Sequence, residues 1–456
     1  MTRTAGPMGR TVVVAIAAAA VVLPGIVFLL GGAPDGDSWS AVVMGLGYTA
    51  LTLLCAQLIL SARVPLLDRL YGGDRLIKVH RLNGRALLSV IALHAAAGLF
   101  ELDESGRSLV VGFSPFGIVF TGAAAGTMVA IAAFAGLRQN KLSIPYEEWR
   151  NLHRLAYYVL PIVLLHALVS GWARTDNVLL FAHSLVLAVL AGAALLDRGR
   201  RFLAAMKRPS RITGIVRRAP DVTSIRFERP IGFRLRPGQF CELAMHREPS
   251  HPFTISSGSG DDELEVTAKS IGDFTDTWPT MNIGTHLIVT GPHGRLIPEC
   301  VIGAPRVVLL AGGIGITPFM SMLRSAEFWD HSDLESVTLL WSVRASSTPP
   351  FLDEIAGIER ELPLATHMVL TSTNGSADGD VEIGTSAEIA LRDLGMQPFA
   401  RGRVTQEVFD RAGICSEPEL TSYALCGPDG FMAACRTMLH QAGVHGSRIV
   451  AESFRL

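Results

Sequence analysis

Four histidines stand in two apolar stretches of the chain at closely matched spacings. His80 and His94 are 14 residues apart, and His153 and His166 are 13 residues apart. At a helical rise of about 1.5 Å per residue, each separation spans about 20 Å. Ionisable side chains are costly in lipid-spanning helices, so this matched set indicates function. Any one of these histidines, taken alone, fits equally well with a hydrogen-bonded core residue.

Histidine nitrogen is a frequent axial ligand of heme iron. If both stretches are helices that run in the same direction, His80 lies at the depth of His153, and His94 at the depth of His166. The spacing therefore predicts two bis-histidine hemes, one above the other in a membrane. A step of 13 residues returns an ideal helix to the same face less well than a step of 14. Pro161 is the residue that would correct this by distorting the second helix.

The elements that would position these histidines are apolar runs in positions 1–200. Six runs have about 19 to 25 residues each, near the ~20 that a membrane-spanning helix needs. They cover 11–31, 39–61, 79–100, 114–137, 152–172 and 178–196. The paired histidines fall on the third and fifth runs. A mean hydropathy of +0.35 and a charged content of 18% also favour a chain that lies partly in lipid.

The charges between the runs predict the orientation of the chain. Lys and Arg gather in alternate connecting segments, and the other segments are mainly acidic. By the positive-inside rule, both termini lie in the cytoplasm of a multi-pass plasma-membrane protein. The first run also fits a cleaved signal sequence. The net charge of −1 gives no reason to expect nucleic-acid binding, and the six cysteines lack the spacing of an iron–sulfur or zinc site.

The composition changes after a basic linker at 201–208. Residues 209–302 alternate β-branched and polar positions between Gly and Pro turns, which predicts a small antiparallel barrel. In 303–456, apolar strands alternate with helical stretches, a pattern typical of a parallel α/β sheet. The predicted fold is therefore an all-α six-helix transmembrane bundle in 1–200, followed by an antiparallel β-barrel domain and an α/β parallel-sheet domain.

Two short motifs in the predicted barrel offer groups that can hold a ligand. The first, at 251–257, contains Phe253 and Thr254, which offer an aromatic stacking surface and a small hydroxyl group. The second, at 269–275, combines Lys269 with a turn at Gly272 whose backbone N–H groups suit a pyrophosphate. Either motif alone also fits a barrel strand followed by a loop.

A glycine-rich loop at 311–318 directly follows an apolar strand and opens a predicted helix. Glycines let the backbone approach a diphosphate, and a helix N-terminus offers free N–H groups to it. A second turn, Cys426 to Pro428, lies further along the chain. The order of strand, loop and turn favours a dinucleotide site.

Taken together, the histidine spacings and these motifs resemble the NADPH oxidase/ferric reductase superfamily, in its prokaryotic form. The resemblance covers nearly the whole chain. It implies a di-heme domain in 1–200, an FAD-binding domain in 209–302 and an NAD(P)H-binding domain in 303–456. The implied heme-iron ligands are His80, His94, His153 and His166.

The resemblance also implies the residues that contact FAD. Thr254 would lie near flavin N5, and both His251 and Lys269 stand where the family often has arginine. The implied FAD contacts are His251, Pro252, Phe253, Thr254, Lys269, Ser270, Gly272 and Thr275. Phe454 resembles a terminal aromatic residue that covers the flavin. The implied catalytic residues are Phe253, Thr254, Cys426 and Phe454.

For the nicotinamide nucleotide, the resemblance implies a site between the glycine loop and the later turn. Arg344 ends a strand where the family often binds the 2′-phosphate of NADPH, so we expect NADPH, with NADH as the alternative. The implied contacts are Gly312, Gly313, Gly315, Thr317, Arg344, Cys426, Gly427 and Pro428.

The expected function is transmembrane electron transfer from NADPH through FAD and two b-type hemes. A hydride carries two electrons and heme iron accepts one, so a flavin is needed between them. Short, acidic outer segments favour ferric ion or ferric chelate as the acceptor. Reduction of dioxygen to superoxide is the first alternative. Electron donation to a partner protein and a heme-free, membrane-anchored flavin reductase also stay open, and His183 fits either a polar group near the outer heme or helix packing.

Overall fold

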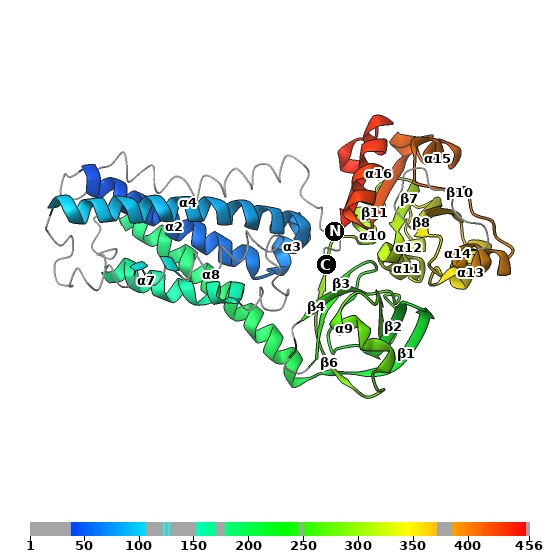
Figure 1. Ribbon diagram of the computed structural model, residues 1–456, viewed down its shortest axis with the longest axis horizontal. Helices are drawn as coiled ribbons and strands as arrows, with labels where there is room; N and C mark the ends of the chain where they lie inside the picture. Colours follow the sequence, from blue (N-terminus) through cyan, green and yellow to red (C-terminus); the bar gives the residue numbers. More distant parts are fainter. Residues whose placement is uncertain are drawn as a thin grey trace. The chain divides into compact units, whose positions relative to one another are not determined.

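The computed structural model describes residues 38–105, 122–123, 126–127, 152–169, 178–245, 248, 250–371 and 385–452. The chain divides into two compact units, Met1–Arg201 and Phe202–Leu456. The first is helical and the second contains both sheets (Figure 1).

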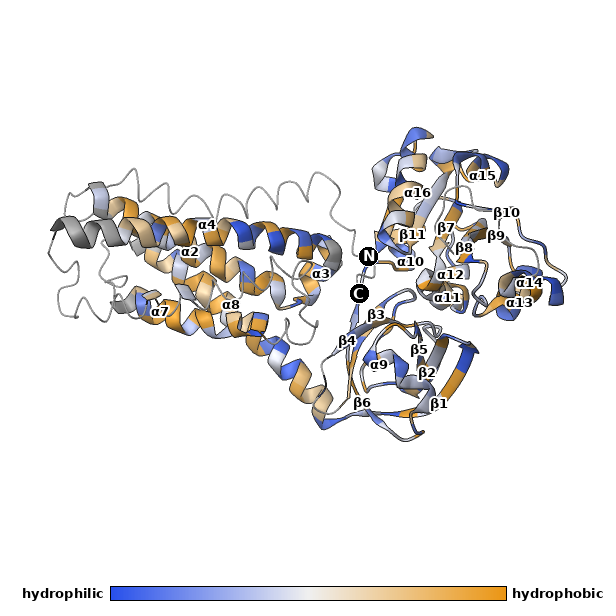
Figure 2. Ribbon diagram, in the orientation of Figure 1, coloured by the Kyte–Doolittle hydropathy of each residue, from blue (hydrophilic) through white to orange (hydrophobic). Residues whose placement is uncertain are grey.

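The first unit is built from helices that pack side by side. Its described helices are α2 (Ser38–Ser61), α3 (Pro65–Tyr71), α4 (Gly73–Ser105), η1 (Leu155–Tyr158), α7 (Val159–Val169) and α8 (Val178–Lys207). Their shared core is apolar, with Leu54 and Leu58 of α2 against Leu87 of α4, Val159 of α7 and Ala191 of α8. Figure 2 shows apolar residues along most of α2, α7 and α8.

Two helices in the described part of the chain are long and apolar enough to cross a membrane. They are Ala41–Ser61 and Phe181–Lys207, and a shorter apolar helix covers Leu152–Ala167. The predicted span at 79–100 lies inside α4, which begins earlier and is not in that class. The predicted spans at 11–31 and, apart from four residues, 114–137 lie outside the described residues. The six-helix bundle therefore stays a prediction.

The second unit begins with a six-stranded sheet in the order β4-β3-β6-β1-β2-β5. Every pairing in it is antiparallel. Its side chains alternate between a buried core and the surface, so that Ile225, Phe227 and Leu243 meet Trp278 inside. The strands are β1 (Ser210–Ala219), β2 (Val222–Glu228), β3 (Phe240–Ala244), β4 (His251–Thr254), β5 (Glu263–Lys269) and β6 (His286–His293). The antiparallel prediction is confirmed.

A second six-stranded sheet, in the order β10-β9-β8-β7-β11-β12, is parallel throughout, as predicted. Its strands are β7 (Arg306–Gly312), β8 (Ser336–Arg344), β9 (Leu364–Thr371), β10 (Ala400–Arg401), β11 (Thr421–Cys426) and β12 (Ile449–Glu452). The central strand β7 is a continuous apolar run because both of its faces are covered.

Helices cover the two faces of the parallel sheet. Leu309 of β7 faces a core that includes α11 (Thr317–Leu323) and α13 (Leu352–Glu361). Leu310, the next residue, faces the opposite core with α16 (Asp429–Gln441). The shorter helices of this unit are α9 (Asp273–Asp276), α10 (Pro298–Val301), α12 (Ala326–Trp329), α14 (Ser386–Asp393) and α15 (Gln406–Arg411).

A buried ion cluster joins the two sheets of the second unit. Arg324, just after α11, lies 2.8 Å from the carboxylate of Glu265 on β5, which also binds Arg218 and Arg226. Burial alone would raise the pKa of Glu265, but the neighbouring guanidinium groups, Arg324 foremost, lower it to about 2. The guanidinium carbon atoms of Arg218 and Arg324 lie 4.8 and 5.0 Å from the centre of the Phe351 ring. The cluster ties the barrel to the parallel-sheet domain.

Candidate functional site

The four histidines of the first unit form two pairs of facing rings. The ring centres of His80 and His153 are 6.1 Å apart, with an interplanar angle of 77°. Those of His94 and His166 are 6.2 Å apart, at 80°. In each pair one ring comes from α4 and the other from the segment 152–169. The structure thus brings together the residues that the sequence paired.

These separations fit a metal held between two imidazoles. Imidazole nitrogen binds a transition metal at about 2 Å and lies about 1 Å from its own ring centre, so two imidazoles that held one metal between them would have their ring centres about 6 Å apart. Nδ1 of His80 is buried without a hydrogen-bond partner among the described residues. No cluster of three or more metal-binding side chains occurs in the described residues. A heme needs only two.

The second pair lies close to glycine backbone. Nδ1 of His94 is 3.0 Å from the carbonyl oxygen of Val43 on α2. A Cβ atom at Gly47 would lie 3.1 Å from Cε1 of His94, and one at Gly122 would lie 3.1 Å from Cε1 of His166. A residue larger than glycine at position 47 or 122 would therefore restrict the space that these rings occupy. The sequence prediction missed these glycines, whose position beside the rings depends on helix packing.

A pair of amide side chains lies beside the first pair of histidines. Nε2 of Gln57 is 3.0 Å from Nε2 of His80. Asn83 donates to Oε1 of Gln57 at 2.7 Å. The sequence prediction missed both amides, although polar side chains in apolar runs are as informative as the histidines.

An aromatic cluster surrounds the first flavin motif. The ring of Phe253 lies 4.8 Å from Trp278 and 5.7 Å from Phe274. The ring of His251 stacks on Phe274 at 4.7 Å. Strand alternation places Thr254 on the opposite face of β4 from Phe253, where it is 5% exposed. Phe274 lies within the second motif at 269–275, and Trp278 lies just beyond it.

The second flavin motif forms the end of β5 and a tight turn. Lys269 forms an ion pair with Asp221 at 2.8 Å. The hydroxyl of Thr275 accepts from the N–H of Ile271 and donates to the carbonyl of Gly272. Gly272 has open space around it, and Ser270 donates its N–H to the backbone of the β1–β2 turn. These hydrogen bonds fix the turn, and its exposed backbone at Gly272 follows the basic side chain of Lys269.

The glycine loop and the later turn lie against each other at the carboxyl edge of the parallel sheet. Cys426 pairs with Ala311 in the β11–β7 register, so both strands end at the same level. A Cβ atom at Gly315 would lie 2.4 Å from the carbonyl oxygen of Cys426, and one at Gly427 would lie 2.9 Å from Cα of Gly312. Only glycine permits this approach of backbone to backbone.

Other predicted nucleotide contacts lie on the same edge. Gly313 adopts a φ of +56° beside open space, and Trp341, which the sequence prediction missed, donates to its carbonyl at 2.9 Å. Thr317 begins α11 and donates to the carbonyl of Ile314. Arg344 ends β8 and is exposed. Pro428 immediately precedes α16. Phe454 lies outside the described residues.

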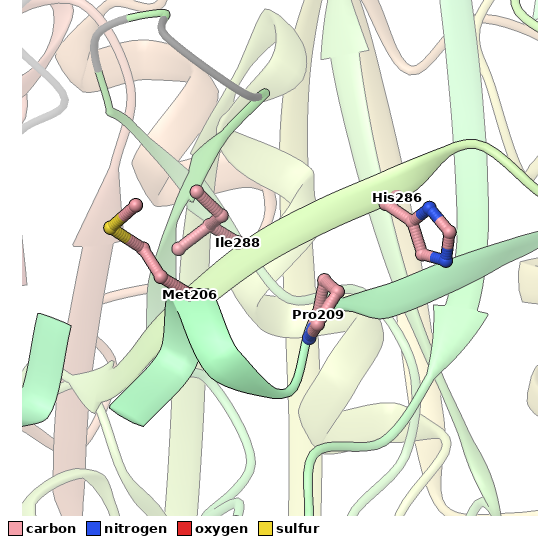
Figure 3. Close-up of a pocket in the computed structure, with 4 residues that line it drawn as sticks. All are labelled: Met206, Pro209, His286 and Ile288. Carbon is pink, nitrogen blue, oxygen red and sulfur yellow. The ribbon is translucent and has the colours of Figure 1, made fainter. Parts of the chain in front are cut away.

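A separate hollow of about 260 Å³ lies where the last turn of α8 meets the barrel (Figure 3). It is lined by Met206, Pro209, His286 and Ile288. These residues include none of the predicted cofactor contacts. The hollow is therefore separate from the flavin and nucleotide motifs.

Three family models match successive parts of the chain. Residues 46–164 match a ferric reductase like transmembrane component, 211–291 match an FAD-binding domain, and 309–437 match an oxidoreductase NAD-binding domain. The chain belongs to the NADPH oxidase/ferric reductase superfamily. The second unit therefore contains the matches to the FAD-binding and NAD-binding domains, and the first contains the match to the ferric reductase like transmembrane component.

Individual proteins match parts of the chain. The flavohemoprotein of Candida norvegensis is 28% identical over 162 residues, covering 33% of this chain and 40% of the relative. Dual oxidase 1 of Homo sapiens is 28% identical over 172 residues, covering 34% and 11%. A ferredoxin NADP+ reductase structure from Neisseria gonorrhoeae matches with a TM-score of 0.43 and 21% identity, covering 54% of this chain and 97% of that one. The chain spans less than two thirds of either of the two curated relatives.

Proposed function

We propose that the protein takes electrons from NADPH on the cytoplasmic side and delivers them across the membrane through FAD and two b-type hemes. The observation that carries this proposal is the spacing of the paired imidazoles, 6.1 Å for His80 with His153 and 6.2 Å for His94 with His166. The four histidines are its metal ligands. Both termini and the nucleotide-binding domains are cytoplasmic in this arrangement, in agreement with the charge pattern of the sequence.

FAD supplies the conversion of hydride to single electrons, and heme supplies one-electron transfer within the membrane. The chain's own residues bind and orient these groups. The aromatic cluster around Phe253 offers a stacking surface for the flavin, with Thr254 as the hydroxyl near its reactive edge. Gly313 and Thr317 present backbone to a diphosphate, and Cys426 ends the strand that lies beside them.

The exposed Arg344 supports NADPH over NADH as the donor. Its position at the carboxyl end of β8 is one strand away from the glycine loop, because β8 pairs with β7. A guanidinium at this edge offers a bidentate partner for a 2′-phosphate.

Ferric ion or a ferric chelate is the proposed acceptor on the opposite side of the membrane. Glu101, Asp103 and Glu104 end α4 beyond His94, about 10 to 15 Å further along the helix axis. Acidic residues at this end favour a cationic acceptor. The similarity to Dual oxidase 1 favours dioxygen as the second candidate.

Anaerobic visible spectroscopy of the purified, FAD- and heme-replete protein tests the proposal. We expect low-spin heme bands that become reduced when NADPH is added. Admission of air or ferric chelate then ranks the two acceptors by the rate of reoxidation. A protein that binds FAD but no heme despite an adequate supply would exclude the transmembrane route and favour the heme-free flavin reductase.

A further inference from the structure

The carboxyl end of α11 forms hydrogen bonds to the first flavin motif, which lies in the barrel. The hydroxyl of Ser321 donates to the carbonyl of Ser257 at 2.7 Å. Arg324, which directly follows the helix, donates from Nη1 to the carbonyl of Ser256 at 2.8 Å. These two carbonyls belong to the last two residues of the motif, two and three positions after Thr254. The helix end therefore binds the flavin motif through the motif's backbone.

The residues that follow in each segment continue these contacts. Ser325 donates its hydroxyl to the carbonyl of Ser321 at 2.6 Å, so its oxygen accepts the N–H of Ser259 at 2.9 Å. A Cβ atom at Gly258 would lie 2.9 Å from the carbonyl oxygen of Arg324. The two segments therefore lie against each other without room for a larger residue at Gly258.

The guanidinium of Arg324 is held in a defined orientation. Its Nε and Nη2 donate to the two carboxylate oxygens of Glu354 at 2.5 and 2.6 Å. This bidentate pair leaves Nη1 for the carbonyl of Ser256 and for the carboxylate of Glu265, each at 2.8 Å. Glu354 lies on α13 of the parallel-sheet domain, whereas Ser256 and Glu265 lie in the barrel. Arg324 therefore connects the two domains through a buried carbonyl and a buried carboxylate.

The other end of α11 adjoins the glycine loop. Thr317 begins the helix and donates to the carbonyl of Ile314, and Gly315 packs against the backbone of Cys426. All seven residues of α11 are buried, and at a rise of about 1.5 Å per residue the helix is about 10 Å long. One short, buried helix thus joins the predicted diphosphate site to the residues that follow the predicted flavin contacts.

We propose that Ser321, Arg324 and Ser325, which we call the latch, are positioning residues that set the distance between the nicotinamide and the flavin. In the step concerned, a hydride leaves NADPH, giving NADP+, and reduces FAD to FADH−. Such a transfer needs the reacting atoms about 3 to 3.5 Å apart, and a misplacement of about 1 Å can slow it roughly 100-fold. The role of the latch rests on this step of the proposed function and is independent of the hemes.

The test compares Ser321→Ala with Ser422→Ala in the full-length, FAD-replete protein. Ser422 is also a buried serine, and it accepts the N–H of Gly303 within the parallel-sheet domain. The control therefore loses a buried hydrogen bond that does not join the two domains. The readouts are the limiting rate of flavin reduction at saturating NADPH, the NADPH concentration that gives half this rate, and the long-wavelength charge-transfer absorbance of the reduced flavin with NADP+.

We expect Ser321→Ala to lower the limiting rate roughly tenfold and to weaken the charge-transfer absorbance, because both depend on how closely the two rings approach. The half-saturating NADPH concentration should keep the parent value, since the glycine loop is unaltered. Ser325→Ala removes the bond to Ser259 and should act in the same direction, which provides a second reading if the first variant does not fold. Ser422→Ala should match the parent in all three readouts.

Parent values of the limiting rate and of the charge-transfer absorbance in both latch variants would overturn this inference and leave the proposed function intact. An equal loss of rate in Ser422→Ala would also overturn it, because the effect would then follow from general destabilisation. A higher half-saturating NADPH concentration at an unchanged limiting rate would assign the latch to nucleotide binding instead. If NADPH does not reduce the FAD of the parent protein, the proposed function itself fails, and the latch has no step to position.

Discussion

At the scale of single residues, glycines define the space beside the functional groups. A Cβ atom at Gly122 would meet the ring of His166, whereas a Cβ atom at Gly126, four residues further along, would have no neighbour within 4 Å. An alanine substitution is therefore expected to have different consequences at Gly122 and at Gly126. This difference provides a test of the second histidine pair.

We expect Gly122→Ala to weaken heme binding at that pair by roughly 10- to 100-fold, because the new methyl group displaces the ligand ring. The heme-to-protein ratio after purification and washing, measured by the pyridine hemochrome spectrum, checks this. Gly126→Ala is the control and is expected to keep the parent ratio. Equal heme-to-protein ratios in both variants would mean that heme binding does not depend on the present position of the His166 ring.

Glu265 offers a second test at the residue scale, because one carboxylate faces three guanidinium groups. Its pKa of about 2 lies below the unfolded value of about 4. A carboxyl group whose pKa is lowered by folding stabilises the protein above the unfolded pKa, and this contribution is lost as the pH falls toward 2.

We expect Glu265→Gln to lower the free energy of unfolding by about 3 kcal/mol at neutral pH, since it removes the buried carboxylate and leaves Arg324 only its more exposed partner Glu354. The difference from the parent should shrink as the pH falls below about 4. Thermal unfolding followed by flavin fluorescence across this pH range measures it. Glu228→Gln, an exposed carboxylate on β2, is the control. A loss that does not depend on pH would assign the effect to packing instead.

At the scale of elements, the parallel register of β7, β8 and β11 gathers the nucleotide motifs at one edge. Sequence reasoning predicted this from the strand, the glycine loop and the later turn at Cys426 taken together, because a glycine loop alone would be weak evidence. It did not find Trp341, whose indole bonds the loop carbonyl at 2.9 Å, because that contact joins neighbouring strands that lie far apart in sequence. The packing of Phe274 and Trp278 around Phe253 was also missed, because it joins a strand to short helices that follow further along the chain.

Gly315 tests whether the packing of the loop on β11 matters. An alanine there would place Cβ 2.4 Å from the carbonyl of Cys426, so the loop must move. We expect Gly315→Ala to slow flavin reduction by NADPH at least about tenfold, equivalent to about 1.4 kcal/mol. Anaerobic stopped-flow absorbance measures the rate. Gly430→Ala on α16, where the added methyl meets open space, should reduce the flavin at the parent rate.

The helices of the first unit show what a sequence can and cannot predict. The depth of each histidine follows from the helical rise, so the pairing of His80 with His153 was predictable. The contacts that hold each ring were not, because the faces that two helices present to each other depend on how their side chains pack. The predicted spans at 11–31 and, apart from four residues, 114–137 lie outside the described residues, so these two predictions stay untested.

At the scale of the whole molecule, the proposed route moves negative charge across a membrane. Each electron that leaves without a compensating cation makes the side of arrival more negative. Moving one charge against 100 mV costs about 2.3 kcal/mol. The rate of outward electron transfer therefore falls unless another ion moves an equal amount of compensating charge.

Sealed proteoliposomes make this measurable. With NADPH outside, a ferric chelate trapped inside and potassium on both sides, we expect a fast initial reduction that declines as the potential grows. Valinomycin lets potassium follow the electrons inward and should restore the initial rate, because it removes a barrier of the size given above. Vesicles that contain Gly315→Ala should show a slower initial rate and respond less to valinomycin, since hydride transfer limits them. If valinomycin leaves the rate of the parent unchanged while the trapped chelate is still reduced, the electrons do not cross as uncompensated charge, and a route with coupled proton transfer takes the place of the one proposed.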